Sequence, residues 1–206
     1  MPGLVFFLLL LGCREKKKQP ETPPKPVATK PAADTPQQGS ANLYAGVDVS
    51  PMDMCYFPID YPKLKIANAT TGPPLVRVIY SRPHLQRRRL FHDILKYDEP
   101  WRLGANEATE IDFYRSATIQ KSKVLPGRYI LYAIPHPGAW TIVLNSNIDS
   151  WGLKQDSTKD VHRFRIPVTS GNPSLEYFTM MFEKTNEGTD LVMAWEDVMA
   201  KLPISF

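Results

Sequence analysis

The sequence has few of the features that identify common structural classes. It contains two cysteines in 206 residues, Cys13 and Cys55, and their unlike contexts predict no structural disulfide. The apolar run over residues 4–11, LVFFLLLL, has eight residues, whereas a helix that spans a bilayer needs ~20. We detect no internal repeat of the kind that solenoids and propellers require.

Motifs of the common catalytic and cofactor sites are also missing. The chain has no G-x-S-x-G nucleophile elbow, no P-loop and no glycine fingerprint of a dinucleotide site. The four histidines, His84, His92, His136 and His162, form no H-E-x-x-H pair, and no CxxC accompanies them. We therefore expect no metal and no cofactor. Cys55, with no base beside it in the sequence, is expected to be a small buried hydrophobic residue.

Excess charge is confined to one part of the chain. Residues 14–42 have a net charge of +3 and hold six of the 20 prolines, whereas residues 43–206 have a net charge of only +1. Nucleic-acid binding needs basic residues gathered on a folded face, so we expect no nucleic-acid partner. Residues 14–42 have almost no large apolar side chains, and this composition predicts an extended, disordered tether.

The N-terminal residues are typical of a bacterial lipoprotein. The run over residues 4–11 fits the apolar region of a signal peptide, and Leu10-Leu11-Gly12-Cys13 is similar to a lipobox. We expect residues 1–12 to be the signal peptide and Cys13 to carry the lipid that anchors residues 13–42 to a membrane. The absence of aspartate directly after Cys13 favours the periplasmic side of the outer membrane. No Lys or Arg precedes the apolar run, which leaves open a cytoplasmic protein with an apolar tail.

Residues 43–206 predict a single all-β domain, an antiparallel β-sandwich of the jelly-roll or immunoglobulin-like type. From Leu64 onward, apolar-alternating runs are separated by Pro, Gly and Asn, and no βαβ alternation occurs. We expect strands over 75–80, 109–114, 118–124, 128–134, 140–145, 161–168, 175–183, 190–195 and a last run ending at 206, with a hairpin turn at 125–127. One long crossover loop holds a candidate short helix over 90–96, and a helical turn is a candidate near 151–158.

Polar side chains gather in the crossover segment, residues 81–110. They include three consecutive arginines at 87–89 and the stretch WRLGANEATE at 101–110. The planar fork of arginine fits carboxylates, phosphates and sugar hydroxyls, and tryptophan stacks on sugars or covers ion pairs. The candidate residues for a ligand site are Arg82, Arg88, Trp101, Arg102, Asn106 and Glu107. The alternative is that these residues bond one another and pin the loop, without binding any ligand.

Motifs along the body point to one family. RVIYSRP, WRLGANEATEIDF, GRYILYAIP, WTIVLN, a W-G pair and the ending LPISF follow one another in the chain. With these motifs, residues 50–206 resemble domain-of-unknown-function family 2911, a family of uncharacterised bacterial secreted proteins and lipoproteins. The resemblance implies export and often lipid anchoring, but no activity, cofactor or catalytic residue. It adds Asp160 and Arg163, which fit a D-x-x-R element, to the candidate site.

The crossover segment departs from the family pattern at three glycines. Arg87, His92 and Asp98 stand where the resemblance implies glycine. If those glycines adopt positive φ or admit a ligand, the loop of this chain must differ there.

Three functions fit these observations. The first is a membrane-anchored extracytoplasmic lipoprotein that binds a small polar ligand, a glycan or an envelope protein near Arg82, Arg102, Asn106 and Glu107. The second is a hydrolase that uses Glu107 or Asp160 as acid or base, with arginines stabilising negative charge. The third is a structural accessory of the envelope.

Overall fold

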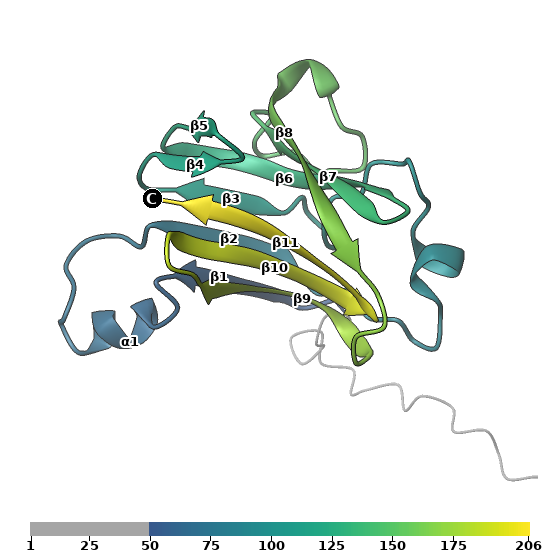
Figure 1. The fold of residues 1–206 in the computed structure, drawn as a ribbon, viewed down its shortest axis with the longest axis horizontal. Helices are drawn as coiled ribbons and strands as arrows, with labels where there is room; N and C mark the ends of the chain where they lie inside the picture. Colours follow the sequence, from purple (N-terminus) through teal and green to yellow (C-terminus); the bar gives the residue numbers. More distant parts are fainter. Residues whose placement is uncertain (1–49) are drawn as a thin grey trace, which may run out of the picture. The chain divides into compact units, whose positions relative to one another are not determined.

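The computed structural model describes residues 50–206, which form an all-β, antiparallel fold as the sequence predicts (Figure 1). The strands are β1 (Met52–Phe57), β2 (Val76–Ser81), β3 (Glu110–Phe113), β4 (Ala117–Ile119), β5 (Ser122–Val124), β6 (Gly127–His136), β7 (Ala139–Asn145), β8 (Asp160–Thr169), β9 (Leu175–Lys184), β10 (Gly188–Glu196) and β11 (Val198–Ser205). The helical segments are α1 (Tyr61–Ile66), the π-turn η1 (Leu90–Ile94) and the 3₁₀ turn η2 (Ser157–Lys159). Among these residues no helix is long and apolar enough to cross a bilayer.

The strands form one sheet that curls into a nearly closed barrel. Its order is β1-β2-β3-β6-β7-β8-β11-β10-β9, and the β4–β5 hairpin joins it at β11. The two halves meet at β8, which pairs with β7 from residue 160 to residue 167 and with β11 at only Met199 and Ala200. The last four strands lie in the order β8-β11-β10-β9, the Greek-key arrangement found in most β-sandwiches.

A cluster of aromatic rings fills one part of the interior. The ring centroid of Trp101 lies 4.8 Å from that of Phe178, 5.7 Å from that of Trp140 and 5.8 Å from that of Trp195. Phe178, Trp140 and Trp195 come from β9, β7 and β10, whereas Trp101 belongs to the connection between β2 and β3. Aromatic pairs add ~0.5–1.5 kcal/mol each beyond their burial. The cluster therefore holds this connection against the barrel.

The barrel closes where β1 and β9, the two ends of the strand order, approach each other. The Tyr80 hydroxyl accepts the backbone N–H of Met180 at 2.8 Å and donates to its carbonyl at 3.2 Å. Arg82 Nε donates to the carbonyl of Phe178 at 3.2 Å, and the Pro83 carbonyl accepts the N–H of the same residue at 2.9 Å. An open strand edge exposes unpaired backbone groups. Residues 80–83 supply partners for these groups of β9.

Arg82 directly follows β2, and its side chain contacts both β1 and β9 at this seam. Its Nη2 donates to Thr179 Oγ1 at 2.9 Å, and its Nη1 lies 3.2 Å from Asp53 Oδ2 on β1. The guanidinium also lies over the ring of Tyr177, 5.9 Å from the centroid. All three guanidinium nitrogens of Arg82 thus donate hydrogen bonds within the protein. Such bonding agrees with the hypothesis that the arginine holds the loop in place and binds no ligand.

The prediction of a hairpin turn at 125–127 is wrong. β6 pairs with β3, and the segment expected to be one strand over 118–124 is itself the β4–β5 hairpin. Gln120 and Lys121 adopt φ values of 46° and 69°, the left-handed conformation required at both positions of a type I′ turn. Because neither residue is Gly, Asn or Asp, the sequence has no turn signal at this point.

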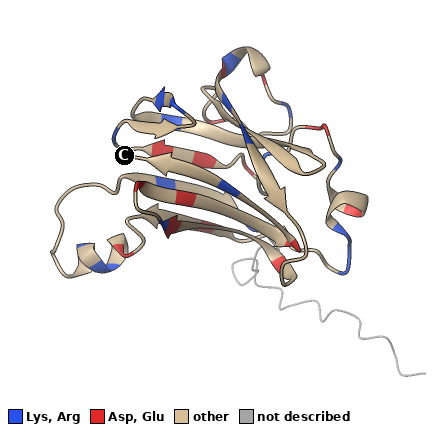
Figure 2. Cartoon of the chain, viewed as in Figure 1, with Lys and Arg blue, Asp and Glu red and all other residues tan. Residues whose placement is uncertain are grey.

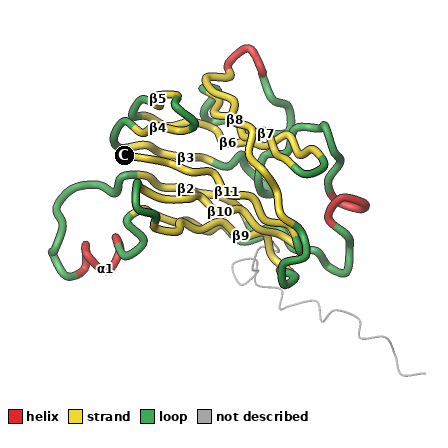
Figure 3. The backbone as a smooth tube through the Cα atoms, in the orientation of Figure 1, coloured by secondary structure: helices red, strands yellow, loops and turns green. Residues whose placement is uncertain are grey.

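Other boundaries also differ from the predictions. β1 precedes the first expected strand, and Leu64 lies in α1 rather than at the start of the β region. The helix expected over 90–96 is limited to the single turn of η1, since Leu95 returns to extended backbone with φ −111°. The helical turn expected near 151–158 occurs at residues 157–159. Figure 3 shows the connection from β2 to β3 as loop with η1 as a single helical turn, outside the barrel.

Two of the three positions that lack the expected glycine keep the backbone typical of glycine. Arg87 and Asp98 adopt φ values of 63° and 65°. Asp98 is supported there by its N–H, which donates to the Pro135 carbonyl at 2.8 Å, and by a contact of its carboxylate with His136 Nδ1. The left-handed bends thus persist without glycine.

We predict that Arg82→Met destabilises the fold by about 2–4 kcal/mol, because it leaves the Phe178 carbonyl without a charged donor and breaks the seam. Urea denaturation measures this change. The matched control is Arg165→Met, which removes an exposed arginine of β8 and should change stability by less than about 0.5 kcal/mol. Equal stability of the two variants contradicts the role of Arg82 in closing the barrel.

Candidate functional site

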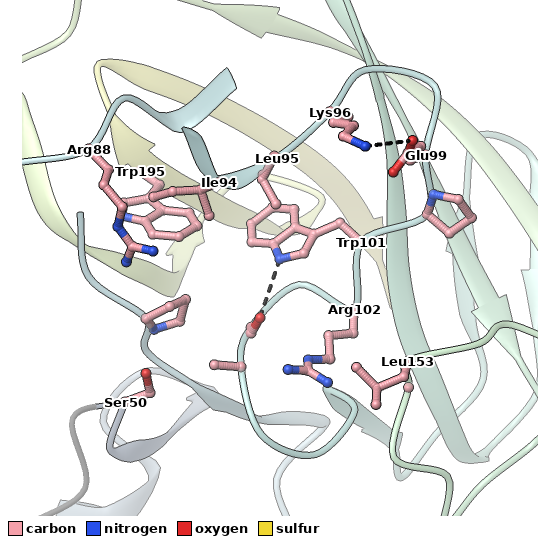
Figure 4. A pocket seen from close by; sticks show the side chains of 15 residues that line it. Ser50, Arg88, Ile94, Leu95, Lys96, Glu99, Trp101, Arg102, Leu153 and Trp195 are labelled. Carbon is pink, nitrogen blue, oxygen red and sulfur yellow. Dashed lines mark hydrogen bonds and ion pairs between the residues drawn. The ribbon is translucent and has the colours of Figure 1, made fainter. Parts of the chain in front are cut away.

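A cavity of about 470 Å³ opens beside the connection from β2 to β3 (Figure 4). Arg102, Arg88 and Lys96 provide its positive charge, and Trp101, Leu95 and Trp195 provide apolar surface. Figure 4 shows Arg88 beside Trp195 and Arg102 beside Leu153, at different sides of the cavity. The volume is in the range of ~300–1,000 Å³ that is typical of small-molecule sites.

Backbone hydrogen bonds fix both ends of the loop that supplies Arg102. Trp101 and Ala133 of β6 exchange two hydrogen bonds, with N···O distances of 2.7 and 2.9 Å. At the other end the Thr109 carbonyl accepts the N–H of Leu131 at 2.8 Å, and Thr109 Oγ1 donates to the Leu103 carbonyl at 2.6 Å. The residues WRLGANEAT therefore form a tight loop against β6.

This loop packs directly on the YSRP segment. A Cβ atom on Gly104 would lie 3.0 Å from the carbonyl oxygen of Ser81, so only glycine allows the two backbones to approach this closely. The two motifs, separated by 17 residues in the sequence, thus form one structural unit. The YSRP part closes the barrel, and the WRLGANEAT part faces the cavity.

Arg102 is the unusual residue of the site. Its Nη1 is buried and has no hydrogen-bond partner among residues 50–206, and its guanidinium makes no ion pair with them. Burial lowers the pKa of Arg102, and the negative charge of Glu107 opposes this change. Buried donors are nearly always satisfied, and an arginine has no acceptor of its own to offer. An unpaired arginine that lines a cavity is suited to bind an anion.

The other two cations of the cavity are partly committed. Arg88 donates from Nε to the Leu85 carbonyl at 2.9 Å and from Nη2 to the His84 carbonyl at 3.0 Å, which fixes its guanidinium at the cavity wall. Lys96 lies 3.6 Å from Glu99, the only acidic residue among the described residues that line the cavity. The lining residues therefore have a net charge of +2. Over the barrel as a whole, acidic and basic residues are interspersed (Figure 2).

Asn106 and Glu107 do not line this cavity. Asn106 adopts φ 56°, and its Nδ2 donates to the Ser50 carbonyl at 3.3 Å, so it holds the start of β1 against the loop. The side chain of Glu107 is exposed and forms no hydrogen bond or ion pair with residues 50–206. Glu107 thus affects Arg102 only as a nearby charge.

Asp160 and Arg163 form a separate cluster at the start of β8. The Asp160 carboxylate accepts Tyr132 Oη at 2.9 Å, Asn145 Nδ2 at 2.7 Å and Arg163 Nη2 at 2.6 Å. Burial and the hydrogen bond to Asp160 raise the pKa of Tyr132 to about 12, so its hydroxyl remains a donor at neutral pH. These groups satisfy one another and do not line the Arg102 cavity. Their arrangement is that of a structural network.

Several cavity residues escaped the sequence analysis. Gly152 and Leu153 lie beside Arg102, and Lys96 and Trp195 also line the cavity. The W-G pair at 151–152 was the feature of the sequence that could have indicated that this loop contributes to the site. Gly152 has φ +76°, and a Cβ there would lie 2.9 Å from Ala108 Cβ and 3.2 Å from Arg102 Cβ. The glycine therefore lets the loop before β8 press against the stem of Arg102.

Within residues 50–206, no group of three or more His, Cys, Asp or Glu side chains is placed to hold a metal ion. Cys55 is a free thiol that packs against the core. Burial raises the pKa of its thiol to about 12, and the charge of Asp53 adds to this effect. Because the thiolate is the nucleophile, these surroundings disfavour a nucleophilic role for Cys55 near neutral pH. Cys13 lies outside the described residues.

We predict that Gly152→Ala destabilises the protein by more than Gly171→Ala. Both glycines have a φ near +80°, but a Cβ on Gly171 meets nothing within 4 Å, whereas one on Gly152 overlaps Ala108. Backbone strain alone should lower the stability of Gly171→Ala by about 1 kcal/mol, and the overlap should add about 1–3 kcal/mol in Gly152→Ala. Urea denaturation of both variants measures the difference. Similar losses contradict a tight contact at Arg102.

Comparison with families of known sequences gives one result for the body of the chain. The model for the family described as "Protein of unknown function (DUF2911)" matches residues 62–204. This match confirms the family that the motifs predict. Comparison with curated proteins and with solved structures finds no match.

Proposed function

Because the chain belongs to the DUF2911 family of proteins of unknown function, we propose its role from the cavity: the domain binds a small anionic molecule at Arg102. The observation that supports this proposal is the side chain of Arg102, which lines a cavity of about 470 Å³ and whose buried Nη1 has no partner among the described residues. A buried, unpaired donor destabilises a protein by ~1–3 kcal/mol. A bound anion removes this penalty.

Binding is better supported than catalysis. The two carboxylates considered for acid or base roles, Glu107 and Asp160, do not line the cavity, and Asp160 is held by three neighbouring side chains. The one carboxylate in the lining, Glu99, is paired with Lys96. A general acid or base must lie within hydrogen-bond reach of the reacting group, directly or through one water. The hydrolase hypothesis therefore lacks a free carboxylate among the described residues that line the cavity.

We also propose that lipid on Cys13 anchors this binding domain outside the cytoplasm, on the periplasmic side of the outer membrane. The support is the sequence alone: the apolar run 4–11, the lipobox-like residues 10–13 and the Pro- and Lys-rich segment that follows. The 29 residues from 14 to 42 span at most about 100 Å when fully extended. Such a tether gives the domain reach from the membrane surface.

We predict that Arg102→Met increases the free energy of unfolding of the ligand-free protein by about 1 kcal/mol, because methionine keeps much of the stem and removes the buried Nη1 donor that has no partner among residues 50–206. Urea denaturation measures this change. The control is Arg89→Met, an exposed arginine in the same connection, which should change stability by less than about 0.5 kcal/mol. A loss of more than 1 kcal/mol in Arg102→Met instead identifies Arg102 as a pin of the loop.

We predict that Cys13→Ser moves the protein from the membrane fraction to the soluble fraction, since serine cannot form the thioether that carries the lipid. Immunoblots of fractionated cells measure the distribution, and Cys55→Ser is the matched control that should leave it unchanged. Membrane association of Cys13→Ser equal to that of the unmodified sequence refutes the lipid anchor and leaves the binding proposal intact.

A further inference from the structure

The two tryptophans of the Arg102 cavity offer a ligand no hydrogen-bonding group. The indole N–H of Trp101 already donates to the Gly104 carbonyl at 3.3 Å, and that of Trp195 donates to the Glu176 carbonyl at 3.1 Å. Both tryptophans therefore present only carbon atoms to the cavity. Ile94, Leu95 and Leu153 extend this apolar surface.

The charged groups of the cavity favour one anionic group. Lys96 is paired with Glu99, and two nitrogens of Arg88 are bound to backbone carbonyls. Arg102 alone keeps its whole guanidinium free of hydrogen bonds within residues 50–206. A free guanidinium binds a carboxylate through two parallel N–H···O bonds.

This distribution argues against a sugar as the body of the ligand. Each hydroxyl of a buried sugar needs a partner, because an unsatisfied polar group loses its hydration without compensation. Among the charged side chains of the cavity, Arg88, Lys96 and Glu99 are already bonded within the protein, and Trp101, Leu95 and Leu153 add apolar surface. A doubly charged phosphate also fits less well than a carboxylate, because Arg88 and Lys96 are already bonded within the protein and leave Arg102 alone to compensate both charges.

We propose that the ligand is an organic carboxylate with a flat apolar body. The carboxylate accepts the N–H groups of Arg102, and the body packs against Trp101, Leu95 and Leu153. This inference rests on the proposed function, because it assigns the ligand class of the same cavity. The volume of about 470 Å³ accommodates a body of one or two fused rings.

Four probes test the ligand class on the full chain in mild detergent: 2-naphthoate, the neutral 2-naphthamide, 2-naphthyl phosphate and glucuronate. Titration calorimetry gives the affinities, and NMR of the tryptophan indole N–H signals shows whether the cavity is the site. We expect 2-naphthoate to bind at least tenfold more tightly than each of the other three and to shift the Trp101 and Trp195 signals.

Variants connect this preference to Arg102. In Arg102→Met the affinity for 2-naphthoate should fall to that for 2-naphthamide, and Arg102→Lys, which keeps the charge without the fork, should lose part of the preference. Arg89→Met should bind 2-naphthoate as the unmodified chain does. Thermal unfolding without ligand checks that each variant folds.

The possible outcomes separate the two proposals. Equal binding of 2-naphthoate and 2-naphthamide in the cavity, or tighter binding of the phosphate or of glucuronate that depends on Arg102, overturns the apolar carboxylate. In the last two cases the anion-binding function stands. Failure of all four probes to shift the Trp101 signal overturns both proposals.

Discussion

The barrel depends on how it satisfies the backbone edge of β9. A strand edge leaves N–H and carbonyl groups unpaired, and β1 does not pair with this edge in the strand order. The hydroxyl of Tyr80, the guanidinium of Arg82 and the carbonyl of Pro83 take the place of a neighbouring strand. Three groups from one short segment thus replace the hydrogen bonds that a neighbouring strand would make with β9. The same bonds fix the start of the connection from β2 to β3.

The candidate site depends on this seam. Ser81 lies within the segment that closes the barrel, and the backbone of Gly104 packs against it. Trp101 and Leu103, on either side of Arg102, are both buried. Arg102 therefore extends from a backbone that cannot easily shift to bring its side chain to a protein partner. The unpaired guanidinium is a property of the scaffold and not of a mobile surface side chain.

The fold could be predicted from the sequence further than the site could. Alternating apolar residues locate most strands because alternate side chains face the interior, and the motifs identify the family. The β4–β5 turn was missed because Gln120 and Lys121 adopt left-handed conformations that their residue types do not favour. The roles of the arginines could not be predicted from the sequence, for another reason. Arg82 and Arg102 look alike in the sequence, and what distinguishes them is the carbonyl of Phe178, 96 residues away from Arg82.

The position of β11 has a consequence for the order of folding. β11 lies between β8 and β10 and also pairs with β4, so residues 198–205 connect strands from both halves of the barrel. A chain that emerges from its N-terminus cannot assemble this core until these residues have been synthesised, and the contacts that close it join distant parts of the sequence. The domain should therefore stay unfolded during synthesis. That delay is compatible with the export that we propose for this chain, in which an extended polypeptide folds after it has crossed the membrane.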